Sequence, residues 1–237
     1  MKLKAVIIED EINARRELEF LLEETGKVNV LQKCGNALDG IRAINQSHPD
    51  VIFLDIQLPE ISGFEMLSMI EITKLPRVVF VTAYDEFAIE AFENDAVDYL
   101  LKPVEKERLS KTIEKLNKLI LGKTPQKLNI APLKRIPSAG ANKVKMVDID
   151  TIQYVHSDET GVFFIDCDKK HFTELTLKVL EEKTKLFRCH KQYLVNLDKI
   201  DEVVFEENSA AKIQTNCKHL IPVSRHYLKE LKEHLGI

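Results

Sequence analysis

Four short apolar segments in the first half of the chain each lead into polar or charged side chains, and this arrangement constrains the fold more than any other feature. Residues with helical spacing separate the segments, which favours parallel strands joined by helices. In an open parallel sheet, the side chains that follow the strands meet at one edge. The residues in these positions are Glu9 and Asp10 after 6–8, Asp55 after 51–54, Thr82 after 78–81 and Lys102 after 99–101. We therefore predict that these five side chains converge in one crevice.

The predicted crevice has the composition of a magnesium-dependent site for a phosphoryl group. Three carboxylates, those of Glu9, Asp10 and Asp55, repel one another unless a cation lies between them. Such hard oxygen ligands favour Mg²⁺, which binds few carboxylates together with water and phosphate oxygens. The Asp55 carboxylate can attack a phosphorus atom. Thr82 and Lys102 can then orient the phosphoryl oxygens.

Residues 1–122 resemble, throughout their length, the receiver domain of two-component response regulators. The segments that carry the resemblance are 6–11, 53–59, Gly63, 81–84 and 98–103. The resemblance implies a flavodoxin-like α/β fold with a five-stranded parallel sheet. It also implies that Asp55 is the phosphoacceptor and that Glu9, Asp10, Asp55 and the backbone carbonyl of Gln57 bind Mg²⁺.

The same resemblance assigns a switch to the end of the sheet. Thr82 and Lys102 hold the phosphoryl group, and Tyr99 is the aromatic side chain that turns inward on activation. The resemblance also implies that the bond between Lys102 and Pro103 is cis. The segment 83–92 and the strand through Tyr99 form the expected output face, through which the phosphorylated protein forms a homodimer.

Length and composition indicate two globular domains. The 237 residues suit two domains of ordinary size, and 44% hydrophobic with 30% charged residues is typical of a soluble protein. No run of 18 apolar residues and no signal peptide is visible, so we expect a cytoplasmic protein without membrane insertion. The four cysteines (Cys34, Cys167, Cys189 and Cys217) are widely scattered, and we interpret them as reduced thiols.

The second half of the chain has the pattern of an antiparallel β domain. Pro125, Pro132 and Pro137 interrupt regular structure after the long helix that begins near residue 105, and we predict a linker at 123–134. Short strands alternate with turns, and helices are predicted at 177–183 and 225–235. Residues 1–123 carry 16 basic and 22 acidic side chains, a net charge of −6, whereas residues 124–237 carry 18 and 16, a net charge of +2. This modest basicity permits binding to nucleic acid without demonstrating it.

Residues 135–237 resemble the LytTR DNA-binding domain, through 186–197 and 221–228 above all. Together with the receiver, they make the chain similar to the LytTR response regulators, and 172–177 favours the BtsR group among them. The resemblance implies that loops at one edge of a mostly β domain enter the major groove. It assigns groove contacts to Lys191 and Arg225 and a third contact to the loop 157–161, where Asp158 and Glu159 are poor neighbours for phosphate.

A cluster of basic residues is predicted to contact DNA phosphates around Lys191. Its members are Lys183, Lys185, Arg188, His190 and Lys191. The phosphate contacts would give salt-dependent affinity, and Arg225 could read guanine.

These observations predict a phosphorylation-activated transcriptional regulator that is not an enzyme. Its expected partners are a sensor histidine kinase, membrane-bound and of the LytS type, and double-stranded promoter DNA. One alternative is a phosphatase of the haloacid dehalogenase type, but such enzymes have an aspartate where this chain has Gln57. A second alternative is a β domain that binds protein or RNA, which salt-dependent, sequence-selective binding to duplex DNA would exclude.

Overall fold

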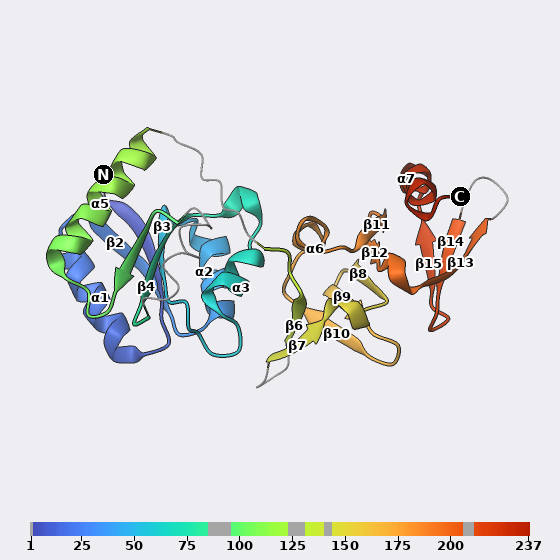
Figure 1. Cartoon of the computed structure of the whole chain (residues 1–237), viewed down its shortest axis with the longest axis horizontal. Coiled ribbons are helices and arrows are strands. Elements are labelled where there is room, and N and C mark those ends of the chain that lie inside the picture. The colour runs from blue at the N-terminus through green and yellow to red at the C-terminus, as the bar shows by residue number, and fades with distance from the viewer. Residues whose placement is uncertain (1, 85–95, 123–130, 140–143, 206–210) are drawn as a thin grey trace. The chain divides into compact units, whose positions relative to one another are not determined.

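The computed structural model describes residues 2–84, 96–122, 131–139, 144–205 and 211–237. The chain divides into two compact units, Met1–Ala131 and Pro132–Ile237 (Figure 1). The division falls inside the segment that was predicted as a linker, whose own bounds stay a prediction. Residues 85–92 of the expected output face lie outside the described residues.

The first unit is built on a five-stranded parallel sheet with the order β2-β1-β3-β4-β5. Its strands are β1 (Leu3–Ile8), β2 (Val28–Cys34), β3 (Val51–Leu54), β4 (Arg77–Thr82) and β5 (Asp98–Leu101). Because β1 lies between β2 and β3, the strand order reverses at β1. The carboxyl ends of β1 and β3 therefore border the crevice where ligands bind in such sheets. The predicted flavodoxin-like fold is confirmed.

Helices cover both faces of this sheet (Figure 1). The helices are α1 (Ile12–Glu24), α2 (Ala37–Ser47), α3 (Gly63–Ser68) and α5 (Lys106–Leu121), with a 3₁₀ turn at Ile72–Lys74. Buried leucines and isoleucines of α1 and α5 form one core cluster with alternate residues of the strands, so these two helices share a face. The side chain of Asn36 caps α2 by accepting a hydrogen bond from the Asp39 amide, and α2 ends at Ser47, followed by His48 as its C-cap and then by a proline.

The second unit contains three antiparallel sheets. The five-stranded sheet has the order β10-β9-β8-β12-β11, and the other two are β13-β14-β15 and β6-β7. The strands are β6 (Arg135–Ala139), β7 (Val144–Asp148), β8 (Tyr154–Asp158), β9 (Gly161–Ile165), β10 (Lys170–Thr173), β11 (Phe187–His190), β12 (Tyr193–Val195), β13 (Ile200–Phe205), β14 (Ala211–Thr215) and β15 (Leu220–Val223). The predicted mostly β domain is confirmed.

The described residues of the second unit also form two helices and two 3₁₀ turns. They are α6 (Leu177–Lys183), α7 (Arg225–Leu235), η2 (Ile149–Thr151) and η3 (Leu197–Lys199). The bounds of α6 and α7 match the sequence prediction. Pro137, which we expected in the break between the domains, lies instead within β6. A two-stranded sheet consists of edge strands, and an edge strand tolerates proline because its amide position faces away from the ladder.

The five-stranded and three-stranded sheets of the second unit share a hydrophobic core. Phe187, Cys189 and Val195 from the five-stranded sheet pack with apolar residues of β14 and β15 and with Leu231 of α7. The Ser224 amide donates a hydrogen bond to the Cys189 carbonyl at 3.0 Å. This bond fixes the start of α7 against the end of β11.

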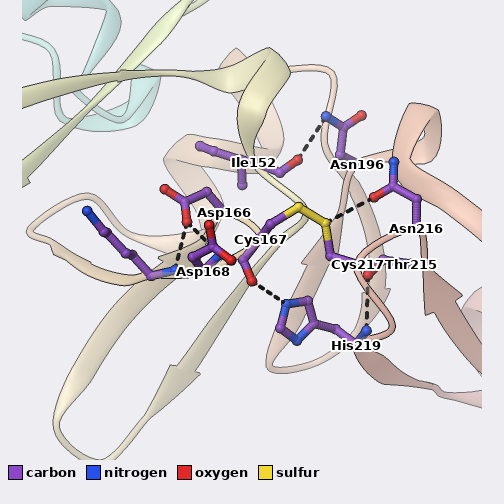
Figure 2. Close-up of a disulfide and its surroundings, with 10 residues drawn as sticks. Ile152, Asp166, Cys167, Asp168, Asn196, Thr215, Asn216, Cys217 and His219 are labelled. Atoms are coloured by element: carbon purple, nitrogen blue, oxygen red, sulfur yellow. Dashed lines mark hydrogen bonds between the residues drawn. A yellow bond between two sulfur atoms is a disulfide. The ribbon is translucent and has the colours of Figure 1, made fainter.

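One expectation about cysteine is wrong: Cys167 and Cys217 form a disulfide (Figure 2). Their Cα atoms lie 5.4 Å apart although 50 residues separate them in sequence. The wide spacing suggested isolated thiols, but two hairpin turns from different sheets bring the residues together. Cys34 and Cys189 are free and buried.

Candidate functional site

Asp55 follows β3 directly and lies at the centre of the crevice in the first unit. Its amide donates to the Ile8 carbonyl at 2.9 Å, which ties the end of β3 to the end of β1. The side chain is buried, and its Oδ1 accepts a hydrogen bond from the Gln57 amide at 3.1 Å. A Cβ atom on Gly63 would lie 2.4 Å from the Asp55 carbonyl oxygen, so a glycine is needed where α3 passes this loop.

Three carboxylates and one ammonium group meet in this crevice. Ligand oxygens of Glu9, Asp10 and Asp55 all lie within 4.8 Å of one another. The Lys102 Nζ is 2.6 Å from Asp55 Oδ2 and 2.5 Å from Glu9 Oε2. One ammonium leaves the three carboxylates with an excess negative charge, so the donor set suits a divalent cation with hard oxygen ligands.

Burial and the ion pair shift the pKa of both Glu9 and Lys102. Burial raises the pKa of Glu9, and the hydrogen bond and charge of Lys102 oppose that shift without cancelling it. Burial alone would lower the pKa of Lys102, but its hydrogen bonds to Asp55 and Glu9 outweigh burial and raise the pKa. The ammonium of Lys102 is therefore charged at neutral pH and available to an anionic group.

Of the expected switch residues, Thr82 is the last residue of β4 and Tyr99 is the second residue of β5. Thr82 is fully buried, and among the described residues its Oγ1 has no hydrogen-bond partner. The Tyr99 side chain is also buried, and its hydroxyl donates to the carbonyl of Tyr84 just after β4. The peptide bond between Lys102 and Pro103 is cis, as predicted. The side chains of the predicted crevice thus lie at one end of the sheet, and Tyr99 lies two residues before that end of β5.

A cleft of about 360 Å³ opens beside these groups. Its lining includes Glu9 and Lys102 from the site, Ala14 and Leu18 from α1, and Pro103. The cleft gives the site an open side lined by both polar and apolar groups.

In the second unit, Lys191 lies exposed in the turn between β11 and β12. The Arg188 guanidinium braces this turn: its Nη1 donates to the Lys191 carbonyl at 3.3 Å, and its Nε and Nη2 bind Glu181 of α6 at 3.0 and 2.9 Å. The His190 Nδ1 accepts from the Gln192 amide at 3.1 Å. Partial burial, followed by the charge of Lys191, lowers the pKa of His190, so this ring is neutral at pH 7.

The turn between β8 and β9 lies beside the Lys191 turn. The Ser157 amide donates to the Gln192 carbonyl at 2.9 Å, and a groove of about 600 Å³ is lined by residues of both turns and of the segment leading into α6. Asp158 turns back on its own loop, where its Oδ1 accepts from the Thr160 amide at 2.8 Å. Lys170 lies 3.6 Å from the Asp158 carboxylate and partly offsets its charge.

Arg225 is exposed at the first position of α7. The bond between Ser224 and Cys189 places this helix start next to the end of β11. The structure therefore brings together the three regions predicted to contact DNA, namely Lys191, the loop 157–161 and Arg225.

Two of the predicted basic residues are separated from that group. Lys185 lies before β11, six residues from Lys191, or about 20 Å along an extended chain. Its Nζ is 2.7 Å from Asp150 and 2.5 Å from Asp198. Lys183 is buried, and burial lowers its pKa. Both lysines have positions that suit a structural role better than a phosphate contact.

Comparison with known proteins identifies both units. Residues 5–114 match the response regulator receiver domain, and residues 142–236 match the LytTr DNA-binding domain. A response regulatory protein of Vibrio cholerae is 49% identical over 234 residues, which is 99% of each chain. The transcriptional regulatory protein BtsR of Escherichia coli K12 is 42% identical over 238 residues, covering 99% of this chain and all of BtsR.

The chain belongs to the LytTR response regulators. It is a DNA-binding regulator of a two-component system, and the resemblance to the BtsR group is confirmed. Among solved structures, the response regulatory domain of MrkE from Klebsiella pneumoniae is 32% identical and covers 51% of this chain and 99% of its own, with a TM-score of 0.46. As a receiver, the first unit implies a sensor kinase as partner and Mg²⁺ at its acidic pocket, and as a LytTR domain the second implies DNA. Among the described helices, none has the length and apolar character required to span a bilayer.

Sequence reasoning missed Glu181 as part of the second site, and it considered Asp158 only as a poor neighbour for phosphate. Glu181 holds Arg188, and Asp158 shapes the loop 157–161 through its own hydrogen bonds. An acidic residue on a short helix carries no signal in the sequence that points to an arginine on a neighbouring strand. The D-x-T spacing of Asp158 and Thr160, in contrast, is a recognisable turn signal.

Proposed function

We propose that this response regulator is activated by transfer of a phosphoryl group from a sensor histidine kinase to Asp55. The observation that carries this proposal is the juxtaposition of the Glu9, Asp10 and Asp55 carboxylates with the Lys102 ammonium at the strand ends. Glu9, Asp10, Asp55 and the backbone carbonyl of Gln57 would hold Mg²⁺. When bound, the ion neutralises the carboxylates and the incoming phosphoryl oxygens.

The side chains of the site have separate roles in this transfer. A carboxylate oxygen of Asp55 attacks phosphorus, and the bond to the donor breaks. The Gln57 amide holds Oδ1 and thereby orients the carboxylate. The Lys102 ammonium, which pairs with both Asp55 and Glu9, can move to a phosphoryl oxygen, where its positive charge stabilises the negative charge on the transferred group. The cleft beside Lys102 gives the donor access.

The proposed activation step uses the buried hydroxyl of Thr82. A phosphoryl oxygen on Asp55 would supply the hydrogen-bond partner that Thr82 lacks among the described residues. Movement of Thr82 would alter the loop whose Tyr84 carbonyl accepts from Tyr99. This is a local charge change that biases a two-state element. The resulting output face would form a homodimer.

DNA recognition is proposed to use the end of the second unit where the three regions meet. Lys191 and Arg225 would contact bases, with His190 beside them and the loop 157–161 as a third contact. Arg188 would act mainly by bracing the Lys191 turn, because Glu181 and the Lys191 carbonyl occupy its guanidinium. Lys185 would contribute at most a peripheral phosphate contact.

The remaining assignments follow from the family. We place the protein in the cytoplasm, with a membrane-bound kinase of the LytS type as its partner, and assign it no catalytic turnover of its own beyond the phosphoryl chemistry of Asp55. The glutamine at position 57 supports this choice over a phosphatase, which would need an acid there.

Labelling by a small phosphodonor tests the receiver mechanism. The full chain, incubated with acetyl phosphate and Mg²⁺, should gain one acid-stable acyl phosphate, detected by intact mass. Asp55→Asn should abolish the gain. Asp39→Asn, which changes an exposed carboxylate on α2, should leave labelling intact. Labelling of Asp55→Asn at the wild-type level would place the acceptor elsewhere.

Capture of fragmented genomic DNA tests the output. The protein should retain a few promoter fragments, and more of them with acetyl phosphate than without it. Retention of no specific fragment by protein with verified phosphorylation would indicate a protein or RNA partner for the second unit.

A further inference from the structure

Cys167 lies in a tightly held turn between β9 and β10. The Asp166 Oδ1 accepts hydrogen bonds from the amides of Asp168 and Lys169 at 3.1 and 2.7 Å, and Asp166 Oδ2 lies 3.0 Å from the His171 Nε2. These bonds fix the backbone on both sides of the cysteine. Cys167 itself is exposed. The turn therefore presents a sulfur atom in a defined position that small reagents can reach.

Cys217 lies in an equally constrained turn between β14 and β15. The Lys218 amide donates to the Thr215 carbonyl at 2.8 Å, and the His219 amide donates to Thr215 Oγ1 at 3.2 Å. The Asn216 amide donates to the Lys199 carbonyl at 2.9 Å. The His219 ring reaches back to within 3.3 Å of the Cys167 carbonyl (Figure 2). The two turns are thus in contact through more than the sulfur atoms.

The other two cysteines differ sharply from this pair. Cys34 and Cys189 are buried, and burial raises their pKa values to about 11 and about 12. Since the thiolate is the reactive form, both are inert at neutral pH. Reversible thiol chemistry in the folded chain is therefore confined to Cys167 and Cys217.

We propose that Cys167 and Cys217 form a reversible redox site, oxidised by small-molecule disulfides, whose closure tightens DNA binding. The thiolate of exposed Cys167 attacks one sulfur of the small disulfide and releases one small thiolate, which takes up a proton. The thiolate of Cys217 then attacks the Cys167 sulfur of the mixed disulfide and releases the second small thiol. Two protein thiols are oxidised to one disulfide, and one small disulfide is reduced to two thiols.

The position of this bond explains how it acts on the DNA-binding end. The five-stranded sheet carries Lys191, and the three-stranded sheet leads through β15 into α7 and Arg225. The bond between Ser224 and Cys189 holds one end of β15, and the Cys167–Cys217 bond holds the turn at the other end. Both ends of β15 are then fixed to the five-stranded sheet of the second unit. A surface that is ordered before binding loses less conformational freedom on contact with DNA.

Thiol mapping tests the site itself. The reduced full chain, alkylated under native conditions, should be modified at Cys167 and Cys217 and not at Cys34 or Cys189. Equilibration with oxidised glutathione should protect the first two and yield one peptide pair joined through them, which dithiothreitol separates. A disulfide between two chains, or glutathione that remains on Cys167, would overturn the proposal.

Thermal unfolding and DNA binding test the consequence. Oxidation should raise the melting temperature of the second unit by on the order of 10 °C, because the bond closes a long loop. The same oxidant should have no effect on Cys217→Ser or on the double variant Cys167→Ser/Cys217→Ser.

The DNA effect rests on the proposed function. The dissociation constant for a captured promoter fragment should fall on oxidation by on the order of threefold, and not in Cys217→Ser. Equal affinity of the oxidised and reduced wild type would refute the regulatory effect. If the disulfide formed and neither state bound specific DNA, the proposed function would fail while the redox site would stand.

Discussion

Thr82 combines complete burial with a hydroxyl that has no hydrogen-bond partner among the described residues. Such a group costs stability, whereas a methyl group of the same shape does not. Thr82→Val should therefore leave the free energy of unfolding within about 1 kcal/mol of the wild type, or raise it. The same variant should lose the gain in DNA affinity that acetyl phosphate produces. Urea denaturation and a DNA-binding titration measure the two effects.

Thr112 is a matched control for this substitution. It is also fully buried, but its Oγ1 donates to Asp98 Oδ2 at 2.7 Å. Thr112→Val should cost about 1.5–3 kcal/mol, as expected for a hydrogen bond to a charged group. An equal loss of stability in the two variants would show that the Thr82 hydroxyl is already satisfied in the resting protein.

Arg188 offers a second test at the level of single residues. If it braces the Lys191 turn, Glu181→Gln should weaken specific DNA binding by about 1 kcal/mol, roughly fivefold in Kd, although a negative charge is removed. Glu182→Gln removes the same charge from the neighbouring position, whose carboxylate pairs with Lys178 instead. This control should bind DNA as well as the wild type or better. Stronger binding by Glu181→Gln would mean that Arg188 contacts phosphate directly.

Sequence reasoning reached some of these residues and not others for a physical reason. The strand-end groups could be predicted, because a parallel sheet places every residue that follows a strand at one edge. Arg188 was predicted to contact DNA, which stays a prediction, and its contact with Glu181 depends on how α6 packs beside β11. No periodicity in the sequence records that packing, and the same holds for the pair of Cys167 and Cys217.

At the level of elements, a buried carboxylate joins β5 to α5. The Asp98 carboxylate accepts hydrogen bonds from the side chains of Arg108 and Thr112 and from the backbone amide of Tyr99. Burial alone would raise the pKa of Asp98, but these hydrogen bonds outweigh burial and lower it. A carboxyl whose pKa is lowered by folding contributes stability above its ordinary pKa and loses that contribution as the pH falls through the folded value.

The first unit should therefore lose stability as the pH falls below the ordinary aspartate pKa of about 3.9 and on through the lower pKa of folded Asp98. Asp98→Asn should lower the free energy of unfolding at pH 7 by about 2 kcal/mol, a modest figure because Arg108 is 42% exposed. Its stability should also depend less on pH between 2 and 5 than that of the wild type. Urea titrations across this range, with Asp39→Asn as control, measure both effects. Parallel pH profiles for wild type and Asp98→Asn would contradict the assignment.

Helices and strands could be predicted from the sequence where neighbouring residues carry the signal. The helices at 177–183 and 225–235 have helical spacing and capping residues, and their bounds were predicted correctly. Short strands such as β11 and β12 are harder, because four and three residues give few repeats from which an alternating pattern can be established. This region was covered by the family resemblance through 186–197 rather than by a periodic pattern.

At the level of the whole molecule, the proposed dimer would link phosphorylation of the first unit to DNA binding by the second. If phosphorylation acts by forming a dimer, the second DNA-binding unit binds at a high effective concentration. Acetyl phosphate should then raise affinity for DNA with two half-sites by about 10²-fold. Affinity for a single half-site should change little. Equal gains on both DNAs would instead indicate a change within one chain, and Asp55→Asn should show neither gain.

Because Glu9, Asp10 and Asp55 lie close together, the stability of the first unit should depend on the cations in solution. Any cation that binds the folded site but not the unfolded chain stabilises the first unit, by about 2.7 kcal/mol at a free concentration of 100 times its Kd. Unfolding of the first unit should move upward by roughly 10 °C in Mg²⁺, while the second unit, which lacks this cluster in its described residues, serves as an internal reference. Calorimetry of the unlabelled chain would thus report occupancy of the receiver without any measurement of phosphate or DNA.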